Sequence, residues 1–307
     1  MTSDIYKRTY GMISGWFPDT ASGDNDVADI DYNSGYYWRK KIYNDKKKYT
    51  IMFPLKSIFG FTEYTKILHL IKIGLSLNRR HDTDISSDVF YGANATTGKL
   101  KFDNITWWVP YIESSLGIEE IITKRLNTQK PIDVVFMKRN MNSITLPTGA
   151  ITQWNLGNYT NSVRFRFIAF KSTDVTSAQT NNALFTTHSG TNKITSLRIQ
   201  LNRMSYPTNG MEINFLDANI VEPYISYINC CMRFGNEPQL TLHEFTKLYP
   251  IMCFDVSSQP QLLKSNGINI TLHIKKSSAL TLLGFCLILE ESHHTIDVLN
   301  GQMIRVN

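Results

Sequence analysis

The sequence predicts an all-β protein of antiparallel sandwich or jelly-roll architecture. Hydrophobic residues recur mostly with a period of two, and short runs of β-branched and aromatic residues are bounded by Gly, Pro, Asn or Ser. Helical patterns are few and short. Many short strands joined by long connections are typical of sandwiches and jelly rolls.

Eleven segments show a strand pattern. They are Tyr49 to Leu55, Lys72 to Leu77, Lys99 to Trp108, Ile132 to Met137, Ile151 to Leu156, Val163 to Phe170, Ile194 to Leu201, Ile251 to Val256, Ile268 to Ile274, Leu280 to Leu289 and Thr295 to Val306. One jelly roll uses eight strands, so we expect two sandwiches with a boundary between Asn127 and Pro131.

The alternation is clearest at the start of the segment Val163 to Phe170. It predicts that Phe165 and Phe167 face a core with Val163, and that Arg164 and Arg166 lie on a polar face. The segment Ile268 to Ile274 repeats the pattern. It places His273 on the polar face, so we interpret His273 as a solvent-facing residue and not as a ligand.

Four short segments have a helical pattern. They are Thr62 to Ile71, Ile118 to Leu126, Ala218 to Phe234 and Thr241 to Leu248. Pro223 predicts a start or a kink in the third segment. In the fourth, Thr241 and Glu244 have the spacing of a capping box.

Composition excludes several classes of protein. The chain has 307 residues, of which 42% are hydrophobic and 19% are charged, so it is not a disordered chain. Its longest nearly uncharged apolar run, Leu280 to Leu289, is shorter than the roughly 20 residues of a membrane-spanning helix. Because no apolar stretch follows Met1, we expect no secretory signal and a reducing compartment.

The cysteines favour buried thiols. Cys230, Cys231, Cys253 and Cys286 form no Cys-x-x-Cys pair. Together with His293 and His294 they make a conceivable zinc ligand set, but free cysteine usually packs as a small hydrophobic residue. We therefore expect no metal and no cofactor.

The formal net charge of +6 is concentrated in the segment from Tyr36 to Tyr49. Its basic residues are Arg39, Lys40, Lys41, Lys46, Lys47 and Lys48. Five aspartates between Pro18 and Asp31 offset this charge, so we interpret the region as a solvated loop followed by a surface strand whose lysines protect a sheet edge. The alternative is a nucleic-acid-binding module in which these cations bind phosphates and the interleaved aromatic residues stack on bases.

No catalytic motif is present. The sequence lacks GxSxG, GxxxxGK[ST], HExxH and GxGxxG patterns, which predicts that the chain is not an enzyme. The densest titratable cluster, around Glu290 and His294, is interpreted as a polar hairpin turn. Trp107 and Trp108 are the only aromatic pair that suits a carbohydrate-binding or enzymatic jelly roll. Alternation instead predicts one indole in the core and one at an interface.

An ordered set of short motifs resembles one family. The motifs are Phe53-Pro54-Leu55, Phe59-Gly60-Phe61, Asn78-Arg79, Gly98-Lys99-Leu100, Trp107-Trp108-Val109-Pro110, Ile144-Thr145-Leu146-Pro147, Arg166-Phe167-Ile168-Ala169-Phe170, Leu201-Asn202, Tyr206-Pro207 and Leu248-Tyr249-Pro250 through Ser257. In this order they resemble the double jelly-roll major capsid proteins of Polinton (Maverick) elements and adintoviruses, from about residue 30 to the end of the chain.

The resemblance implies a structural protein with no enzymatic site. In that family two jelly rolls stand side by side, and homotrimers form capsomers that tile an icosahedral shell around double-stranded DNA. It therefore implies contacts with neighbouring capsomers, a penton protein and encapsidated DNA bound without sequence specificity. It also implies a location in the virion capsid after assembly in the host cytoplasm or nucleus, without secretion, and the chain could be an endogenous viral copy.

The resemblance also divides the chain. Residues 1–130 correspond to a partial first jelly roll and residues 131–307 to the second. Relatives have further strands upstream of the basic segment, so the amino-terminal half is not expected to be stable alone in its family form. We expect the chain to be a fragment; the alternatives are that a partner supplies the strands or that residues 1–50 repack.

Overall fold

The computed structural model describes most of the carboxyl-terminal half and shorter parts of the amino-terminal half. The described residues are 20, 34–35, 37–38, 41, 48, 50–63, 72–78, 101–111, 113, 115–159, 163–173, 184–185, 193–215, 219–234, 237–257, 268–297 and 302–306. The chain divides into two compact units, one of Met1–Phe59 with Lys138–Glu291 and the other of Gly60–Met137 with Ser292–Asn307.

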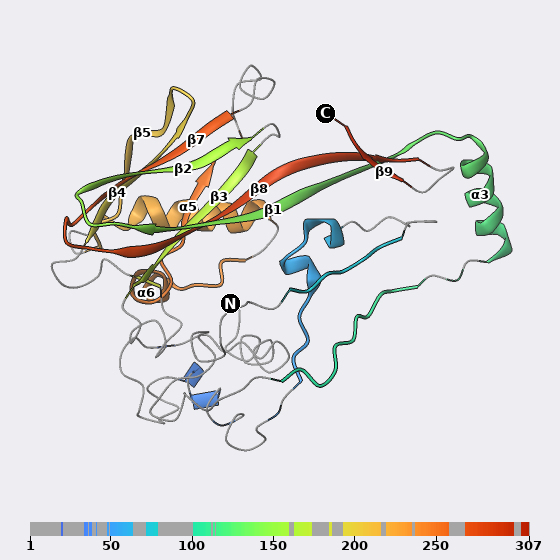
Figure 1. Cartoon of the computed structure of the whole chain (residues 1–307), viewed down its shortest axis with the longest axis horizontal. Coiled ribbons are helices and arrows are strands. Elements are labelled where there is room, and N and C mark those ends of the chain that lie inside the picture. Colours follow the sequence, from blue (N-terminus) through green and yellow to red (C-terminus); the bar gives the residue numbers. More distant parts are fainter. Residues whose placement is uncertain are drawn as a thin grey trace. The chain divides into compact units, whose positions relative to one another are not determined.

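Eight strands, β1 to β8, form two antiparallel sheets (Figure 1). They are β1 (Ile132–Leu146), β2 (Ile151–Tyr159), β3 (Val163–Ser172), β4 (Ile194–Leu201), β5 (Met204–Glu212), β6 (Met252–Asp255), β7 (Ile268–Lys276) and β8 (Leu282–Ile296). The first sheet has the order β1-β8-β3-β6 and the second β2-β7-β4-β5. The chain crosses between sheets at every connection except β4 to β5, which is the strand order of a jelly roll.

The core lies between the two sheets. In the second sheet, alternate residues of β7 are buried from Ile268 to Lys276, and Leu272 of β7 pairs with Trp154 of β2. In the first sheet, Gly284 of β8 faces the same Trp154, since a Cβ placed on Gly284 would lie 3.0 Å from the Trp154 ring. Every second residue of these strands is buried between the sheets, and the burial of Ile, Leu and Val side chains there stabilises the sandwich.

The alternation in β3 differs from the prediction. Arg166 is completely buried, whereas Phe167 is only half-buried. Phe165 and Phe167 contact Phe234, the residue that directly follows helix α5 (Val221–Arg233), at ring-centroid distances of 4.8 and 6.1 Å. The predicted polar face of β3 is therefore wrong at Arg166, because β3 is a central strand whose second face is covered by a helix that the strand pattern does not reveal.

Helices α5 and α6 (Leu242–Lys247) of the first unit lie within the segments predicted as helical. Helix α5 has Pro223 in its first turn, where its missing N–H is tolerated. Helix α6 starts with the predicted capping box. In it, Thr241 Oγ1 accepts the Glu244 N–H at 3.2 Å, while the Glu244 carboxylate accepts the Thr241 N–H at 2.8 Å.

The second unit contains helix α3 (Leu116–Asn127), the start of β1, the end of β8 and β9 (Met303–Arg305). Strand β9 pairs antiparallel with β8, with Arg305 opposite His294. The Phe136 ring of β1 stacks on His294 at 5.3 Å. Gly60, in the 3-10 helix η2 (Gly60–Glu63), approaches the backbone so closely that an added Cβ would overlap the Met137 carbonyl oxygen.

Three predicted strands are wrong in their described residues. The described residues of Tyr49 to Leu55, Lys72 to Leu77 and Lys99 to Trp108 contain no strand, and the 3-10 helix η1 occupies Leu55–Ser57. These segments carry β-forming residues but have no described strand beside them, and an isolated strand leaves its backbone unpaired. The predicted helix Thr62 to Ile71 lies outside the described residues beyond Glu63.

Two other predictions need correction. Strand β8 runs through Glu290 to Ile296, so the polar cluster there is not a hairpin turn. In the described residues of the strand predicted from Thr295 to Val306, the end of β8 and the short strand β9 take its place. Strand β5 was not predicted, because its sequence MSYPTNGME contains Pro207 and Gly210 and lacks apolar alternation. It pairs with β4 at the edge of the second sheet.

Candidate functional site

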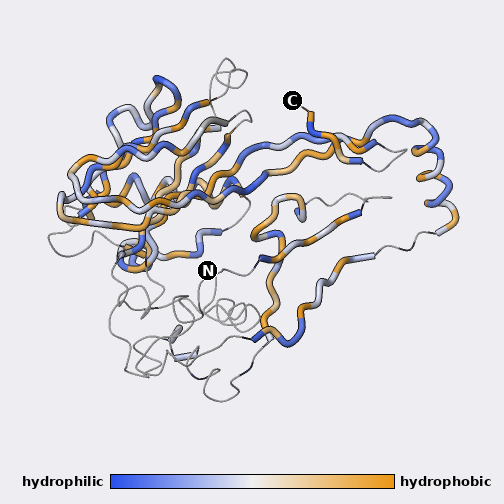
Figure 2. Tube along the Cα trace, viewed as in Figure 1, coloured by the Kyte–Doolittle hydropathy of each residue, from blue (hydrophilic) through white to orange (hydrophobic). Residues whose placement is uncertain are grey.

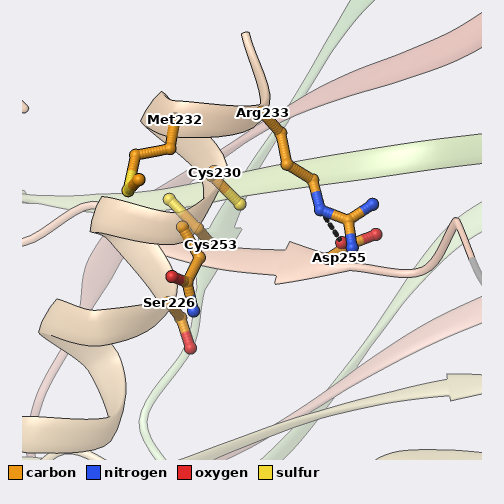
Figure 3. A pocket seen from close by; sticks show the side chains of 7 residues that line it. Ser226, Cys230, Met232, Arg233, Cys253 and Asp255 are labelled. Carbon is orange, nitrogen blue, oxygen red and sulfur yellow. Dashed lines mark ion pairs between the residues drawn. The ribbon is translucent and has the colours of Figure 1, made fainter. Parts of the chain in front are cut away.

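A pocket of about 460 Å³ opens between helix α5 and the edge strand β6. It is lined by Ser226, Asn229, Cys230, Met232, Arg233, Cys253 and Asp255. Figure 3 shows the side chains of the helix and of the strand meeting in this space. Antiparallel pairing with β3 holds β6 in place, with Cys253 opposite Phe167 and Asp255 opposite Phe165.

An ion pair lies at one side of this pocket. Arg233, the last residue of α5, donates from Nε to Asp255 Oδ2 at 3.0 Å (Figure 3). Its Nη1 donates to Ser257 Oγ at 3.2 Å, and the Ser257 N–H donates to Asp255 Oδ1 at 2.9 Å. These bonds hold the carboxylate and the guanidinium in place against each other and against Ser257.

Two of the residues that line the pocket carry buried thiols. Cys230 and Cys253 are 2% and 1% exposed, and both sulfur atoms lie between α5 and β6 (Figure 3). The interaction with the neighbouring Cys253 thiol lowers the pKa of Cys230 below its usual value, and Arg233 acts in the same direction. The same contact, together with burial, raises the pKa of Cys253 well above its usual value. Cys230 is therefore the more acidic of the two thiols.

The neighbouring cysteines have other environments. Cys231 is half-buried, and burial raises its pKa, while a hydrogen bond with Tyr227 acts against this shift. Cys286 is completely buried between the sheets, with its Sγ 3.9 Å from Arg166 Nη1. The prediction of buried thiols is confirmed for Cys230, Cys253 and Cys286.

The conceivable zinc ligand set is not assembled in the described part of the chain. His293 lies 3.4 Å from Asp133, and His294 stacks on Phe136. No group of three or more His, Cys, Asp or Glu side chains among the described residues is arranged to hold a metal ion. Within those residues the geometry offers no metal-ligand cluster.

The sequence does not predict this pocket. Cys230 and Cys253 were each assigned to a buried position, but nothing in their spacing predicted that they would meet. Arg233 and Asp255 were not singled out at all. The only signal is positional: each residue lies one position before the end of a predicted element, the helix Ala218 to Phe234 and the strand Ile251 to Val256.

The basic segment is described only in part. Arg39, Lys40, Lys46 and Lys47 lie outside the described residues, while Lys41 and Lys48 lie within them. The Lys41 ammonium lies over the rings of Trp38 and Tyr37, 5.3 and 5.9 Å from their centroids. Residues 37, 38 and 41 have helical backbone, so the surface strand predicted there is wrong at these positions.

Exposed apolar residues gather in the described segments that precede β1. Trp107 is 39% exposed and Trp108 is 81% exposed, so the predicted division of these indoles between core and interface is wrong. The segment has no strand, and alternation therefore does not apply. Ile51, Met52 and Phe53 are also exposed, and Figure 2 shows hydrophobic residues along the part of the chain that carries η1. Contiguous exposed apolar residues are typical of protein interfaces.

Helix α3 is exposed as well. None of its residues is buried, and Leu116 and Ile121 are 85% and 67% exposed. No helix among the described residues is both long enough and apolar enough to cross a membrane.

A family model described as "Double jelly roll-like domain" matches residues 24–293. The chain belongs to the double jelly roll-like domain family. The strand order of β1 to β8 agrees with one such jelly roll. No curated protein sequence matches the chain.

Solved structures similar to this double jelly roll-like chain include viral particles. The Sputnik virophage structure determined by cryo-EM gives a TM-score of 0.38 at 11% identity, covering 57% of this chain and 39% of that chain. The PBCV-1 virus capsid gives a TM-score of 0.35 at 11% identity, and the match covers 61% of this chain and 55% of that chain. The crystal structure of PBCV-1 VP54, fitted into a cryo-EM reconstruction of the virophage Sputnik, gives a TM-score of 0.36 at 11% identity. The match covers 60% of this chain and 54% of that chain. This chain thus spans between 39% and 55% of the lengths of these chains.

Proposed function

We propose that this protein is a major capsid subunit of a double-stranded DNA virus or virus-like transposable element. The observation that carries the proposal is the jelly-roll strand order of β1 to β8 in a chain matched by the double jelly roll-like family over residues 24–293. The ordered motifs that resemble Polinton and adintovirus capsid proteins support the more specific assignment. The protein acts by self-assembly and has no enzymatic role.

The same proposal divides the chain into two domains. Residues 1–130 belong to a partial first jelly roll and residues 131–307 to the second. The eight strands between Ile132 and Ile296 support this assignment. Exposed apolar residues before β1 support contacts with neighbouring subunits, in trimeric capsomers that tile an icosahedral shell.

Size-exclusion chromatography with light scattering on the full coding sequence tests the proposal. A trimer that associates further at high concentration is expected, whereas a strictly monomeric species contradicts it. Trp108→Ala combined with Tyr111→Ala removes two strongly exposed aromatic residues and should weaken association. Lys101→Ala, in the same segment but charged and exposed, is the matched control and should leave the trimer unchanged.

The genomic neighbourhood tests the more specific assignment. A packaging ATPase, a protease and a penton-type single jelly roll encoded nearby are expected for an element of the Polinton or adintovirus type. Their absence around intact copies of the gene would remove that assignment while leaving the capsid proposal to the association experiment.

The alternative is a nucleic-acid-binding module that uses the basic segment. Lys41 already covers one face each of Tyr37 and Trp38, which leaves less ring surface for stacking on bases. The alternative predicts DNA binding that weakens steeply with salt and is lost when Lys46, Lys47 and Lys48 are replaced by Ala. Unchanged binding in this triple variant would exclude it.

A further inference from the structure

We propose that Cys230 and Cys253 are a reversible oxidation site, at which a hydroperoxide converts the two thiols into a disulfide that ties helix α5 to the edge strand β6. The proposal concerns the chemistry of the folded subunit and does not depend on the proposed function. It rests on where the two thiols lie, what surrounds them and how a small oxidant reaches them.

The first observation is the meeting of the two side chains. Cys230 is on α5 and Cys253 is on β6, and both side chains line the same pocket between these two elements. Both sulfur atoms lie in the space between the two elements (Figure 3), and each thiol shifts the pKa of the other. Two thiols placed in this way can approach each other to form a sulfur–sulfur bond of about 2.05 Å.

The second observation is access. Both cysteines are almost completely buried, yet both line the pocket of about 460 Å³ between α5 and β6. The pocket also presents the polar side chains of Ser226 and Asn229, so a hydroperoxide has both room and hydrogen-bonding partners there. Cys286 is equally buried but lies between the sheets and does not line this pocket.

The third observation is the asymmetry of the pair. The neighbouring Cys253 and the charge of Arg233 both lower the pKa of Cys230, so the thiolate forms more readily at Cys230. The Cys253 thiol donates to the Ile251 carbonyl oxygen at 3.5 Å, which favours its protonated form. Cys230 is therefore the attacking sulfur and Cys253 the resolving one.

The reaction balances in two steps. The Cys230 thiolate attacks one oxygen of hydrogen peroxide, the O–O bond breaks, and a sulfenic acid forms while hydroxide leaves and takes up the proton that Cys230 released. The Cys253 sulfur then attacks the sulfenic sulfur, the S–O bond breaks, and water leaves with the Cys253 proton. The two thiols lose two electrons and the peroxide becomes two waters.

The neighbouring Cys231 does not compete for the same bond. Adjacent residues of a helix point in directions about 100° apart, and the Cys231 thiol bonds to Tyr227, one turn earlier in α5. A Cys230–Cys231 disulfide would require the helix to unwind. The disulfide to Cys253 leaves α5 intact and closes a loop over residues 231–252, which contains α6.

Peptide mass spectrometry on the reduced 307-residue chain tests the proposal. The chain is treated with hydrogen peroxide in the presence of EDTA, free thiols are blocked with N-ethylmaleimide, and the digest is searched for cross-linked peptides. A Cys230–Cys253 peptide that disappears on treatment with dithiothreitol is expected. We also expect an unfolding midpoint raised by roughly 5–10 °C in the oxidised protein.

Two variants separate this reaction from non-specific oxidation. In Cys253→Ser the sulfenic acid should accumulate at Cys230 and be trapped by dimedone, with a yield at least about tenfold above that at Cys286. In Cys231→Ser the Cys230–Cys253 peptide should form as in the unchanged chain. The absence of that peptide from the oxidised chain, or its replacement by a Cys230–Cys231 or intermolecular disulfide, would overturn the proposal.

Discussion

Arg164 and Arg166 show how strongly environment separates two residues of the same type. Both were predicted on the polar face of β3. The Arg164 side chain is 28% exposed and pairs with Glu291, whereas Arg166 is completely buried between the sheets beside Cys286. Burying an arginine stem contributes packing as well as charge.

Replacement of Arg166 by Ala should therefore lower the free energy of unfolding by about 2–4 kcal/mol, because it leaves a cavity in the inter-sheet core. Arg164→Ala should cost less than about 1 kcal/mol, since it removes a partly exposed ion pair. Urea denaturation of both variants measures the difference. Equal losses would contradict the burial assigned to Arg166.

His273 lies on the outer face of the second sheet, half-buried, with its Nε2 2.7 Å from Gln200 Oε1. Burial, together with the charge of Arg198 across the strand, lowers the pKa of His273 below 6.5. The prediction of a solvent-facing polar residue therefore holds only in part. The folded state disfavours the protonated ring.

This shift predicts that stability falls as the pH drops through about 6.5, because the unfolded chain takes up the proton first. The unchanged chain should lose more unfolding free energy between about pH 7 and pH 5 than His273→Gln does. Arg198→Gln should remove part of the difference. Parallel pH profiles for the unchanged chain and His273→Gln would refute the prediction.

At the scale of elements, helix α6 depends on its first turn. The capping box of Thr241 and Glu244 satisfies two backbone N–H groups of a helix that has only six residues. Thr241→Ala should lower the free energy of unfolding by about 0.5–2 kcal/mol. Thr241→Ser keeps the hydroxyl and should retain most of the stability in thermal unfolding, so a loss equal to that of Ala would show that the cap is not responsible.

The two sheets approach each other most closely where Gly284 of β8 faces Trp154 of β2. A Cβ on Gly284 would lie 3.0 Å from Trp154 and 3.4 Å from the Ile144 side chain. Gly284→Ala should therefore destabilise the sandwich by about 1–3 kcal/mol. Gly117→Ala in α3, where a Cβ meets nothing within 4 Å, is the matched control and should be neutral or stabilising in the same measurement.

At the scale of the whole molecule, the jelly-roll order gives β8 a central position. It lies between β1 and β3, and its residues Leu282 to Ile296 run from the core of the sandwich to the pairing with β9. Because β1 to β8 complete both sheets, residues 131–307 are predicted to fold without the amino-terminal half.

A fragment of residues 131–307 should show a β-type circular dichroism spectrum and a cooperative unfolding transition. A fragment that ends before Leu282 lacks the central strand and should remain unfolded. A non-cooperative transition in the longer fragment would show that the second jelly roll needs the residues before it.

The sequence by itself determined the start of β1, the strands β2, β3, β4, β6 and β7, the α6 cap and the all-β class, because these follow from local periodicity and capping chemistry. The tertiary structure alone decided that β8 continues through Glu290 to Ile296 and that β5 pairs despite Pro207. It also decided that Arg166 is buried and that Cys230 meets Cys253. These features depend on which residues distant in sequence lie against each other. The periodicity of a sequence does not reveal which residue a side chain meets across a sheet or beneath a helix.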